Sequence, residues 1–319
     1  MSTDTETHPG VHLLPCDISA YRKGNTGIDY VTTIDSGLPG PHVMVNALTH
    51  GNELCGAHAL TYLFDNDVRP VRGRLTLSFA NVAAYETFDA ANPYASRFVD
   101  EDFNRLWDQS TLDGPRKSRE LTRARAMREV FETADHLLDI HSVDLPQPAM
   151  LLAGQRAKGR ALAAAIGKPR HVVMDRGHDA GKRVRDFAAF DEPESPRSAC
   201  LVECGYHFHT KTTDIAIETS LRFLRHLGIV SKNFAKSRLP QEADEPQLFV
   251  KVTDPVTIET DDFQFVRTFQ GFEVIPEEAT LIARDGDRPI RTPYPDCVLV
   301  MPAREPLRGK TAVRLGRLV

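Results

Sequence analysis

Three short apolar runs, each followed by a histidine or a glutamate, constrain the fold of this chain more than any other feature. The runs are residues 43–48 before His50, residues 137–140 before His141, and residues 199–202 before Glu203. Short apolar runs of this kind are typical of buried strands. In an open α/β sheet, ligands bind beyond the carboxyl ends of the strands. We therefore expect these three polar residues to meet at one edge of a sheet.

The segment His50-Gly51-Asn52-Glu53 joins the first run to residues 53–64, which have the apolar spacing of a helix. Residues three apart project the same way on a helix or a tight turn, so the imidazole of His50 and the carboxylate of Glu53 can bind one ion. Gly51 would let the backbone turn sharply between them.

His141 is the third candidate ligand, because a catalytic zinc typically takes three protein ligands, often two histidines and one glutamate, and leaves a fourth position for water. Asp139 could orient a histidine ring if its strand is regular. A carboxylate beside a metal-activated water is the usual general base in hydrolysis, which is the role predicted for Glu203. Each residue alone more often has a structural role. Together they predict one zinc ion (Zn2+) per chain.

Four motifs occur in a fixed order: HGNE at 50–53, DFNR at 102–105, DIHS at 139–142 and VECG at 202–205. With them the chain resembles the succinylglutamate desuccinylase and aspartoacylase family, which is related to the zinc carboxypeptidases. The match covers most of residues 20–230. The resemblance implies that the zinc ligands are His50, Glu53 and His141, and that Glu203 is the catalytic carboxylate.

The same resemblance implies that Asn104 and Arg105 hold the substrate and that Arg97 polarises the scissile carbonyl. The chemistry of arginine agrees, because a guanidinium is always charged and meets a carboxylate with two parallel hydrogen bonds. One arginine can anchor a substrate carboxylate while another stabilises an oxyanion. Residues 92–105 are polar and lack helical periodicity, so we expect a loop. The alternative is that both arginines pair with the acidic residues 100–102 at the surface.

Composition excludes several classes of protein. The chain has 319 residues, of which 41% are hydrophobic and 26% charged, as in soluble globular proteins. Its net charge of −5 gives no electrostatic support for nucleic-acid binding, and no apolar run is long enough to span a membrane. The first ten residues lack the pattern of a signal peptide. We expect these ten residues to be frayed, within an N-terminal tail at 1–20, and we expect a cytoplasmic location.

The five cysteines are odd in number and form no C-x-x-C pair, so neither a disulfide framework nor a cysteine zinc site is predicted. Cys55 and Cys204 flank candidate site residues. We interpret them as small buried thiols, with a thiol nucleophile as the rival interpretation. His207 and His209 alternate, so they would face one way on a strand.

Alternating strand and helix patterns over residues 21–235 predict an α/β domain whose mixed sheet has helices on both faces, as in zinc carboxypeptidases. Strands are expected at 30–34, 43–48, 75–80, 149–153 and 171–174, and helices at 121–134 and 214–227. Arginines and glutamates, Glu120 among them, alternate along the first of these helices and predict a solvated face. The polar, proline-containing residues 231–246 are expected to form a linker. Short β-rich runs over 247–319 predict a small C-terminal β domain, with Tyr294 as its candidate substrate contact.

The sequence therefore predicts a zinc-dependent amidohydrolase that cleaves the amide bond of an N-acyl amino acid, such as an N-succinyl or N-acetyl amino acid. One alternative is a zinc carboxypeptidase that acts on short peptides. The other is a non-catalytic zinc-binding protein, which would have no use for Glu203 beside an open coordination position. The residues Arg183, Arg185 and Arg197 are unranked candidates for a second carboxylate contact. The acyl group, the amine and the oligomeric state, homo-oligomer included, stay open.

Overall fold

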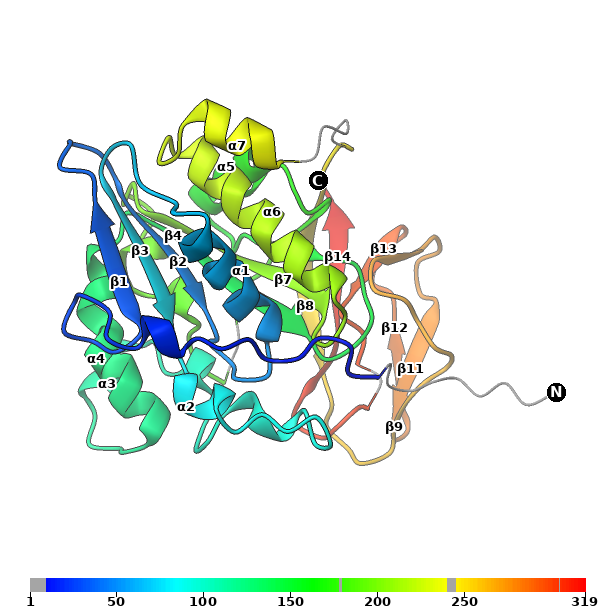
Figure 1. The fold of residues 1–319 in the computed structure, drawn as a ribbon. Coiled ribbons are helices and arrows are strands. Elements are labelled where there is room, and N and C mark those ends of the chain that lie inside the picture. Colours follow the sequence, from blue (N-terminus) through cyan, green and yellow to red (C-terminus); the bar gives the residue numbers. More distant parts are fainter. Residues whose placement is uncertain (1–9, 178–179, 240–244, 304) are drawn as a thin grey trace.

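The computed structural model describes residues 10–177, 180–239, 245–303 and 305–319, which are built around one large mixed sheet (Figure 1). The sheet has the strand order β1-β3-β2-β4-β7-β5-β6-β8-β14-β13-β10. Its first seven strands are β1 (Val31–Asp35), β3 (Arg74–Phe79), β2 (His42–Ala47), β4 (His136–Val143), β7 (Ser198–Tyr206), β5 (Met150–Leu152) and β6 (His171–Met174). The other four are β8 (Leu248–Thr257), β14 (Thr311–Leu318), β13 (Cys297–Val300) and β10 (Glu273–Ile275). A separate antiparallel sheet contains β12 (Arg288–Arg291), β11 (Leu281–Asp285) and β9 (Phe263–Phe265).

Helices cover both faces of the large sheet, so the predicted fold class is confirmed (Figure 1). Helices α1 (Leu54–Asp65), α5 (Ala157–Ile166) and α6 (Lys211–His226) pack on one face, and α4 (Arg119–Thr133) packs on the other. The strands alternate accordingly: Val43 and Val45 of β2 contact the α1 side, whereas Met44 contacts the α4 side. Shorter helices are α2 (Val82–Tyr85), α3 (Gln109–Asp113) and α7 (Lys232–Arg238).

Strands β2, β4 and β7 are parallel neighbours, and their register positions the candidate site. Asn46 of β2 lies opposite Asp139 of β4, and His141 of β4 lies opposite Glu203 of β7. Directly opposite residues project from the same face of a sheet. The polar side chains therefore emerge on the α4 face, near the carboxyl ends of the three strands.

Several predicted loops contain short helices. The expected linker at 231–246 includes α7, which begins where Ser231 Oγ accepts a hydrogen bond from Phe234 N at 3.1 Å. The expected loop at 92–105 includes the 3-10 turns Ala95–Arg97 and Phe103–Arg105. Helix α5 was not predicted at all. Side-chain caps begin α7 and the turn Phe103–Arg105, where Asp102 accepts from Asn104 N, and none of these short elements has a long apolar stripe.

Residues 11–20 of the expected N-terminal tail contact the main core, while residues 1–9, nearly all of the expected frayed segment, lie outside the described part of the chain. The backbone nitrogens of His12 and Leu13 donate to Phe208 O at 3.0 and 2.9 Å. The side chains of Leu13 and Ile18 are buried in the main core. The acidic composition of the first residues concealed these two apolar anchors.

The C-terminal strands extend the large sheet, because β8 pairs in parallel with β6. They also have a core of their own, formed by residues between 256 and 315. A further apolar cluster joins Val298 and Val300 to Met150 and Leu201 of the preceding strands. The predicted boundaries at 235 and 247 stay a prediction.

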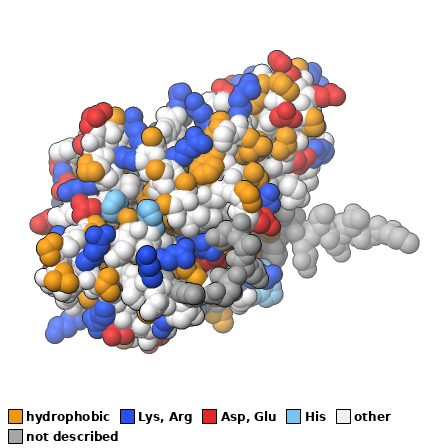
Figure 2. Space-filling model, turned by 90° about the horizontal axis from the view of Figure 1, so that it is seen from above, with side chains coloured by type: hydrophobic (Ala, Val, Ile, Leu, Met, Phe, Trp, Pro, Cys, Tyr) orange, Lys and Arg blue, Asp and Glu red, His pale blue; other side chains and the backbone are white. Residues whose placement is uncertain are grey.

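Surface charge is mixed on the face shown in Figure 2, where basic, acidic and hydrophobic side chains are interspersed. Each helix in the described ranges is too short or too polar to cross a membrane.

Candidate active site

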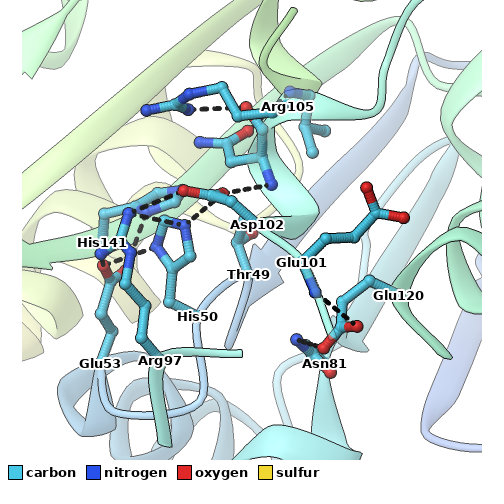
Figure 3. A network of polar contacts seen from close by, with 12 residues as sticks. Thr49, His50, Glu53, Asn81, Arg97, Glu101, Asp102, Arg105, Glu120 and His141 are labelled. Carbon is cyan, nitrogen blue, oxygen red and sulfur yellow. Dashed lines mark hydrogen bonds and ion pairs between the residues drawn. The ribbon is translucent and has the colours of Figure 1, made fainter. Parts of the chain in front are cut away.

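The structure brings His50, Glu53 and His141 together at the carboxyl ends of β2 and β4 (Figure 3). All three are buried, and their candidate ligand atoms lie within 4.8 Å of one another. Glu53, which immediately precedes α1, is central: its Oε1 is 2.7 Å from His50 Nδ1, and its Oε2 is 2.8 Å from His141 Nδ1.

This donor set fits a zinc ion, because two imidazole nitrogens and one carboxylate form a standard set of ligands for catalytic zinc. Glu53 Oε2 is buried without a hydrogen-bond partner, even though His141 Nδ1 is 2.8 Å away. A buried polar atom with no partner calls for an explanation, and a bound cation would satisfy this oxygen.

The ring of His141 is oriented by Asp139, whose Oδ2 lies 2.8 Å from His141 Nε2. Asp139 Oδ1 in turn accepts hydrogen bonds from Asn46 Nδ2 at 2.8 Å and from Thr49 Oγ1 at 2.9 Å. Metal-ligating histidines normally engage their second ring nitrogen in this way. The interaction leaves His141 Nδ1 as the nitrogen that faces Glu53.

The ring of His50 is held by the segment that contains the DFNR motif. His50 Nε2 lies 2.9 Å from Asp102 Oδ1 and 3.0 Å from Arg97 Nη2. Asp102 also accepts hydrogen bonds from Asn104 N at 2.8 Å and from Arg97 Nη2 at 3.2 Å. Sequence reasoning considered Asp102 only as an ion-pair partner, because a carboxylate 52 residues from a histidine gives no local signal.

The electrostatics of the cluster favour positive charge at its centre. Burial opposes the ionised form of Glu53, but His50 and His141 hold its pKa well below the usual value. Burial likewise opposes protonation of His141, yet Asp139 and Glu53 raise its pKa well above the usual value. The same two carboxylates would stabilise a metal cation.

Glu203 lies in β7 opposite His141, and its Oε2 is buried without a hydrogen-bond partner. Burial raises the pKa of Glu203 to about 8. A carboxylate with a pKa near neutrality can both accept and return a proton, which is what general acid–base catalysis requires.

Arg97, Asn104 and Arg105 come from one segment beside this cluster. Arg97 Nη1 is 3.6 Å from Glu53 Oε1. Asn104 Oδ1 accepts a hydrogen bond from Val184 N at 2.9 Å, which fixes its amide group. Arg105 Nη1 donates to Asn104 O at 2.7 Å. Within the described part of the chain, Arg105 has no carboxylate at ion-pair distance.

A buried glutamate that sequence reasoning missed anchors this segment (Figure 3). The Glu120 carboxylate accepts hydrogen bonds from the backbone nitrogens of Val99, Asp100 and Glu101 at 2.7, 3.0 and 3.3 Å. It also accepts one from Asn81 Nδ2 at 3.1 Å. The predicted solvated position of Glu120 is therefore wrong. Acidic residues in a first helical turn usually interact with the helix dipole, so no sequence signal indicated that Glu120 is buried.

The structure does not bring Tyr294 to the cluster. Tyr294 is buried in the C-terminal core, where its hydroxyl is 2.5 Å from Thr253 Oγ1 and the guanidinium of Arg317 stacks on its ring. The predicted substrate contact receives no support from this position.

The three candidates for a second carboxylate contact already have partners. Arg183 forms two hydrogen bonds with Asp175 and one with Asp186. Arg185 donates to Asp186 Oδ1 at 2.6 Å. Arg197 donates to Glu132 O and precedes β7, so it lies at the opposite edge of the sheet.

The remaining histidine and cysteine predictions have different outcomes. His207 is buried with Nδ1 2.7 Å from Ser142 Oγ, whereas His209 is exposed, so the expected shared face is wrong because β7 ends at Tyr206. Cys55 and Cys204 are free and buried. Burial raises the pKa of the Cys204 thiol well above its usual value, which disfavours a thiolate nucleophile.

Comparison with known proteins identifies the family. Residues 39–227 match the family model described as the succinylglutamate desuccinylase/aspartoacylase catalytic domain. The chain belongs to this family. Its members are hydrolases that remove acyl groups. No curated protein sequence matches the chain.

Solved structures share the fold of the family along nearly the whole chain. Succinylglutamate desuccinylase from Vibrio cholerae is 17% identical with a TM-score of 0.65, and the match covers 91% of this chain and 86% of that protein. The product-bound ectoine utilization protein EutE (DoeB) from Ruegeria pomeroyi is 18% identical with a TM-score of 0.63, and the coverage is 93% and 92%. Succinylglutamate desuccinylase/aspartoacylase from Rhodobacter sphaeroides is 16% identical with a TM-score of 0.65, and the coverage is 91% and 88%.

Proposed function

We propose that this protein is a zinc-dependent amidohydrolase that removes the acyl group from an N-acyl amino acid. One observation carries the proposal: a free carboxylate, Glu203, lies in register with His141 of the buried cluster completed by His50 and Glu53. Membership of a family named after a desuccinylase and an aspartoacylase supports this class of reaction.

The chemistry divides among a few groups. The cluster of His50, Glu53 and His141 would hold the zinc ion, which when bound supplies Lewis acidity that acidifies a water molecule and polarises a carbonyl. Glu203 takes a proton from the attacking water and passes it to the leaving amine. Its raised pKa, caused by burial, suits both transfers.

The arginines stabilise and position the substrate. Arg97 lies beside Glu53 and carries charge that can stabilise the oxyanion of the tetrahedral intermediate. Arg105, which lacks an ion-pair partner in the described residues, is the group we assign to the carboxylate of the amino acid. Asn104 supports it through the bond between its backbone oxygen and Arg105 Nη1.

The test is the variant Glu203→Gln, which keeps the shape of the side chain and removes the base. Elemental analysis should find one zinc per chain in this variant and in the wild type, with similar melting temperatures. Turnover should fall at least about 100-fold, the usual scale of general acid–base catalysis. Near-normal turnover would return Glu203 to a structural role.

A substrate panel completes the test. N-succinyl amino acids, N-acetyl amino acids and dipeptides would be incubated with the zinc-loaded protein, and the free amine would be measured. Hydrolysis of the N-acyl amino acids supports the proposal. Preference for the dipeptides would indicate a carboxypeptidase, and inertness towards all three would indicate a zinc-binding protein without catalysis.

A further inference from the structure

Arg314 in β14 is a partly buried cation without a counter-ion. Its guanidinium has neither a hydrogen bond nor an ion pair among the residues that the structure describes. Its neighbour Arg317, by contrast, stacks on the ring of Tyr294 at 3.6 Å. Burial of a charge without a partner costs free energy, so the position of Arg314 requires an explanation.

The sheet register places Arg314 on the same face as the catalytic carboxylate. Arg314 lies opposite Val300 of β13, and Val300 packs in one cluster with Met150 and Leu201. Met150 lies opposite Glu203, and Leu201 precedes Glu203 by two residues on β7. Cross-strand partners and alternate residues of a strand share a face.

The charges on this face act on one another. Burial lowers the pKa of Arg314, whereas Asp175 and Glu203 act to raise it. Burial also lowers the pKa of Arg105, and Arg314 is among the cations that lower it further. Arg314 therefore lies within electrostatic range of Arg105, on the face of the sheet that carries Glu203.

Neither of these two arginines forms an ion pair with a described residue, although Asp102 acts on Arg105 and Asp175 and Glu203 act on Arg314 through space. Arg105 has one hydrogen bond, to Asn104 O, and no ion-pair partner within the described ranges. Arg183, the other cation nearby, is already neutralised by Asp175 and Asp186. Two like charges in a partly buried place repel each other, and an anion between them would offset the repulsion.

We propose that Arg314 is a substrate-binding residue, supplied by the C-terminal strands, that binds a substrate carboxylate alongside Arg105. The two arginines are about two hundred residues apart in the sequence, and Arg105 precedes Glu203 whereas Arg314 follows it. The proposal rests on the proposed function only for the class of substrate, a small carboxylic acid. It gives the C-terminal strands a direct part in recognition.

The test uses succinate, a small dicarboxylate, as the probe and measures its binding to the zinc-loaded protein by calorimetry. Arg314→Gln should weaken binding about 10-fold or more, since a hydrogen bond to a charged group contributes about 1.5–3 kcal/mol and each 1.4 kcal/mol is tenfold. Arg314→Lys keeps the positive charge but loses the pair of parallel N–H donors, so its affinity for succinate should lie between those of the wild type and Arg314→Gln. The matched control is Arg284→Gln, an exposed arginine of β11, which should bind like the wild type. Equal affinity of Arg314→Gln and wild type, or no binding to wild type, would overturn the proposal.

A second readout separates a binding role from a structural one. Without ligand, Arg314→Gln should melt at or above the wild-type temperature, because the substitution removes an unpaired charge that repels Arg105. A structural arginine would lower the melting temperature instead, and that result would contradict the proposal.

The two proposals fail in different ways. Succinate binding that depends on Arg314, combined with no hydrolysis of any N-acyl amino acid, would refute the proposed function alone. Hydrolysis of such a substrate with an unchanged KM in Arg314→Gln would refute the role of Arg314 alone.

Discussion

At the scale of single residues, the candidate site depends on two carboxylates, Asp139 and Asp102, that orient the histidine ligands and have no assigned contact with the substrate. Asp139 lies 2.8 Å from His141 Nε2, and Asp102 lies 2.9 Å from His50 Nε2. Each fixes one ring so that the other nitrogen, Nδ1, faces Glu53. The metal affinity of the site should therefore depend on these partners almost as strongly as on the ligands.

Replacement of Asp139 by Asn tests this dependence. Loss of the carboxylate should weaken zinc binding about 10–100-fold, the usual effect of removing such a partner, while His141→Ala should abolish most of it. Zinc affinity would be measured by competition with a chelator. The control is Asp287→Asn, an exposed position in the turn after β11. Unchanged affinity in Asp139→Asn would show that His141 does not need this partner.

The sequence predicted most of the candidate site residues because they follow an apolar run. His50, His141 and Glu203 could be recognised in this way, and Glu53 lies three residues from His50. Asp102 could not be recognised, because its role arises from contact with the distant His50. The proposed role of Arg314 could not be recognised either, because it depends on how distant strands are placed. No periodicity or motif marks an arginine that lacks a counter-ion.

At the scale of elements, helix α4 holds the segment that carries the arginines. Glu120 in its first turn accepts three backbone hydrogen bonds from residues 99–101 and thereby sets the positions of Arg97 and Asp102 on either side.

Gly51 also helps to position this segment. Residues 51–52 form the predicted turn, in which Glu53 N donates to His50 O at 3.3 Å. Close packing also requires glycine here, because a Cβ at this position would lie 2.4 Å from backbone atoms of Ala84 and Ser96.

The change Glu120→Gln should disturb this segment. Glutamine offers one acceptor oxygen and turns an NH2 group toward backbone donors, so we expect a stability loss of about 1–3 kcal/mol and a fall in kcat/KM. Urea unfolding and steady-state kinetics would measure the two effects. Glu129→Gln, a surface change on the same helix, is the control and should alter neither quantity. Wild-type stability for Glu120→Gln would contradict the anchoring role.

Long, periodic elements were predicted well and short ones poorly. Helices α4 and α6 and strands β2 and β3 lie within a few residues of their predicted positions. The short helices α2, α3 and α7 have too few residues for an apolar stripe. They form where tertiary contacts and caps, such as Asn81 at α2 and Asp108 at α3, offset weak local preference.

At the scale of the whole molecule, the C-terminal strands are joined to the α/β part by backbone pairing and by side-chain packing. Strand β8 extends the sheet from β6, and Val250, Val298 and Val300 complete an apolar cluster with Leu201. The sequence pattern predicted that helical segments give way to short strands near residue 247. It did not predict that β8 pairs with β6, because the pairing of distant strands is not encoded in local sequence.

Truncation after residue 246 should therefore damage the rest of the molecule. Removal of β8 would expose the edge of β6 and half of the shared cluster, and unprotected edges promote aggregation. We expect the shortened chain to be poorly soluble and to lose its cooperative melting, as measured by circular dichroism. A soluble fragment that melts like the wild type would instead establish residues 247–319 as an independent domain.

The parallel register of β2, β4 and β7 also limits how the length of the chain can change. One residue inserted in β4 ahead of Asp139 would turn both Asp139 and His141 toward the α1 side, because side chains alternate between the faces of a strand. An insertion in the loop at 144–149, between β4 and β5, leaves that alternation intact. Insertions and deletions can therefore accumulate in the loops of this protein, whereas the spacing within β4 is fixed by the chemistry at its end.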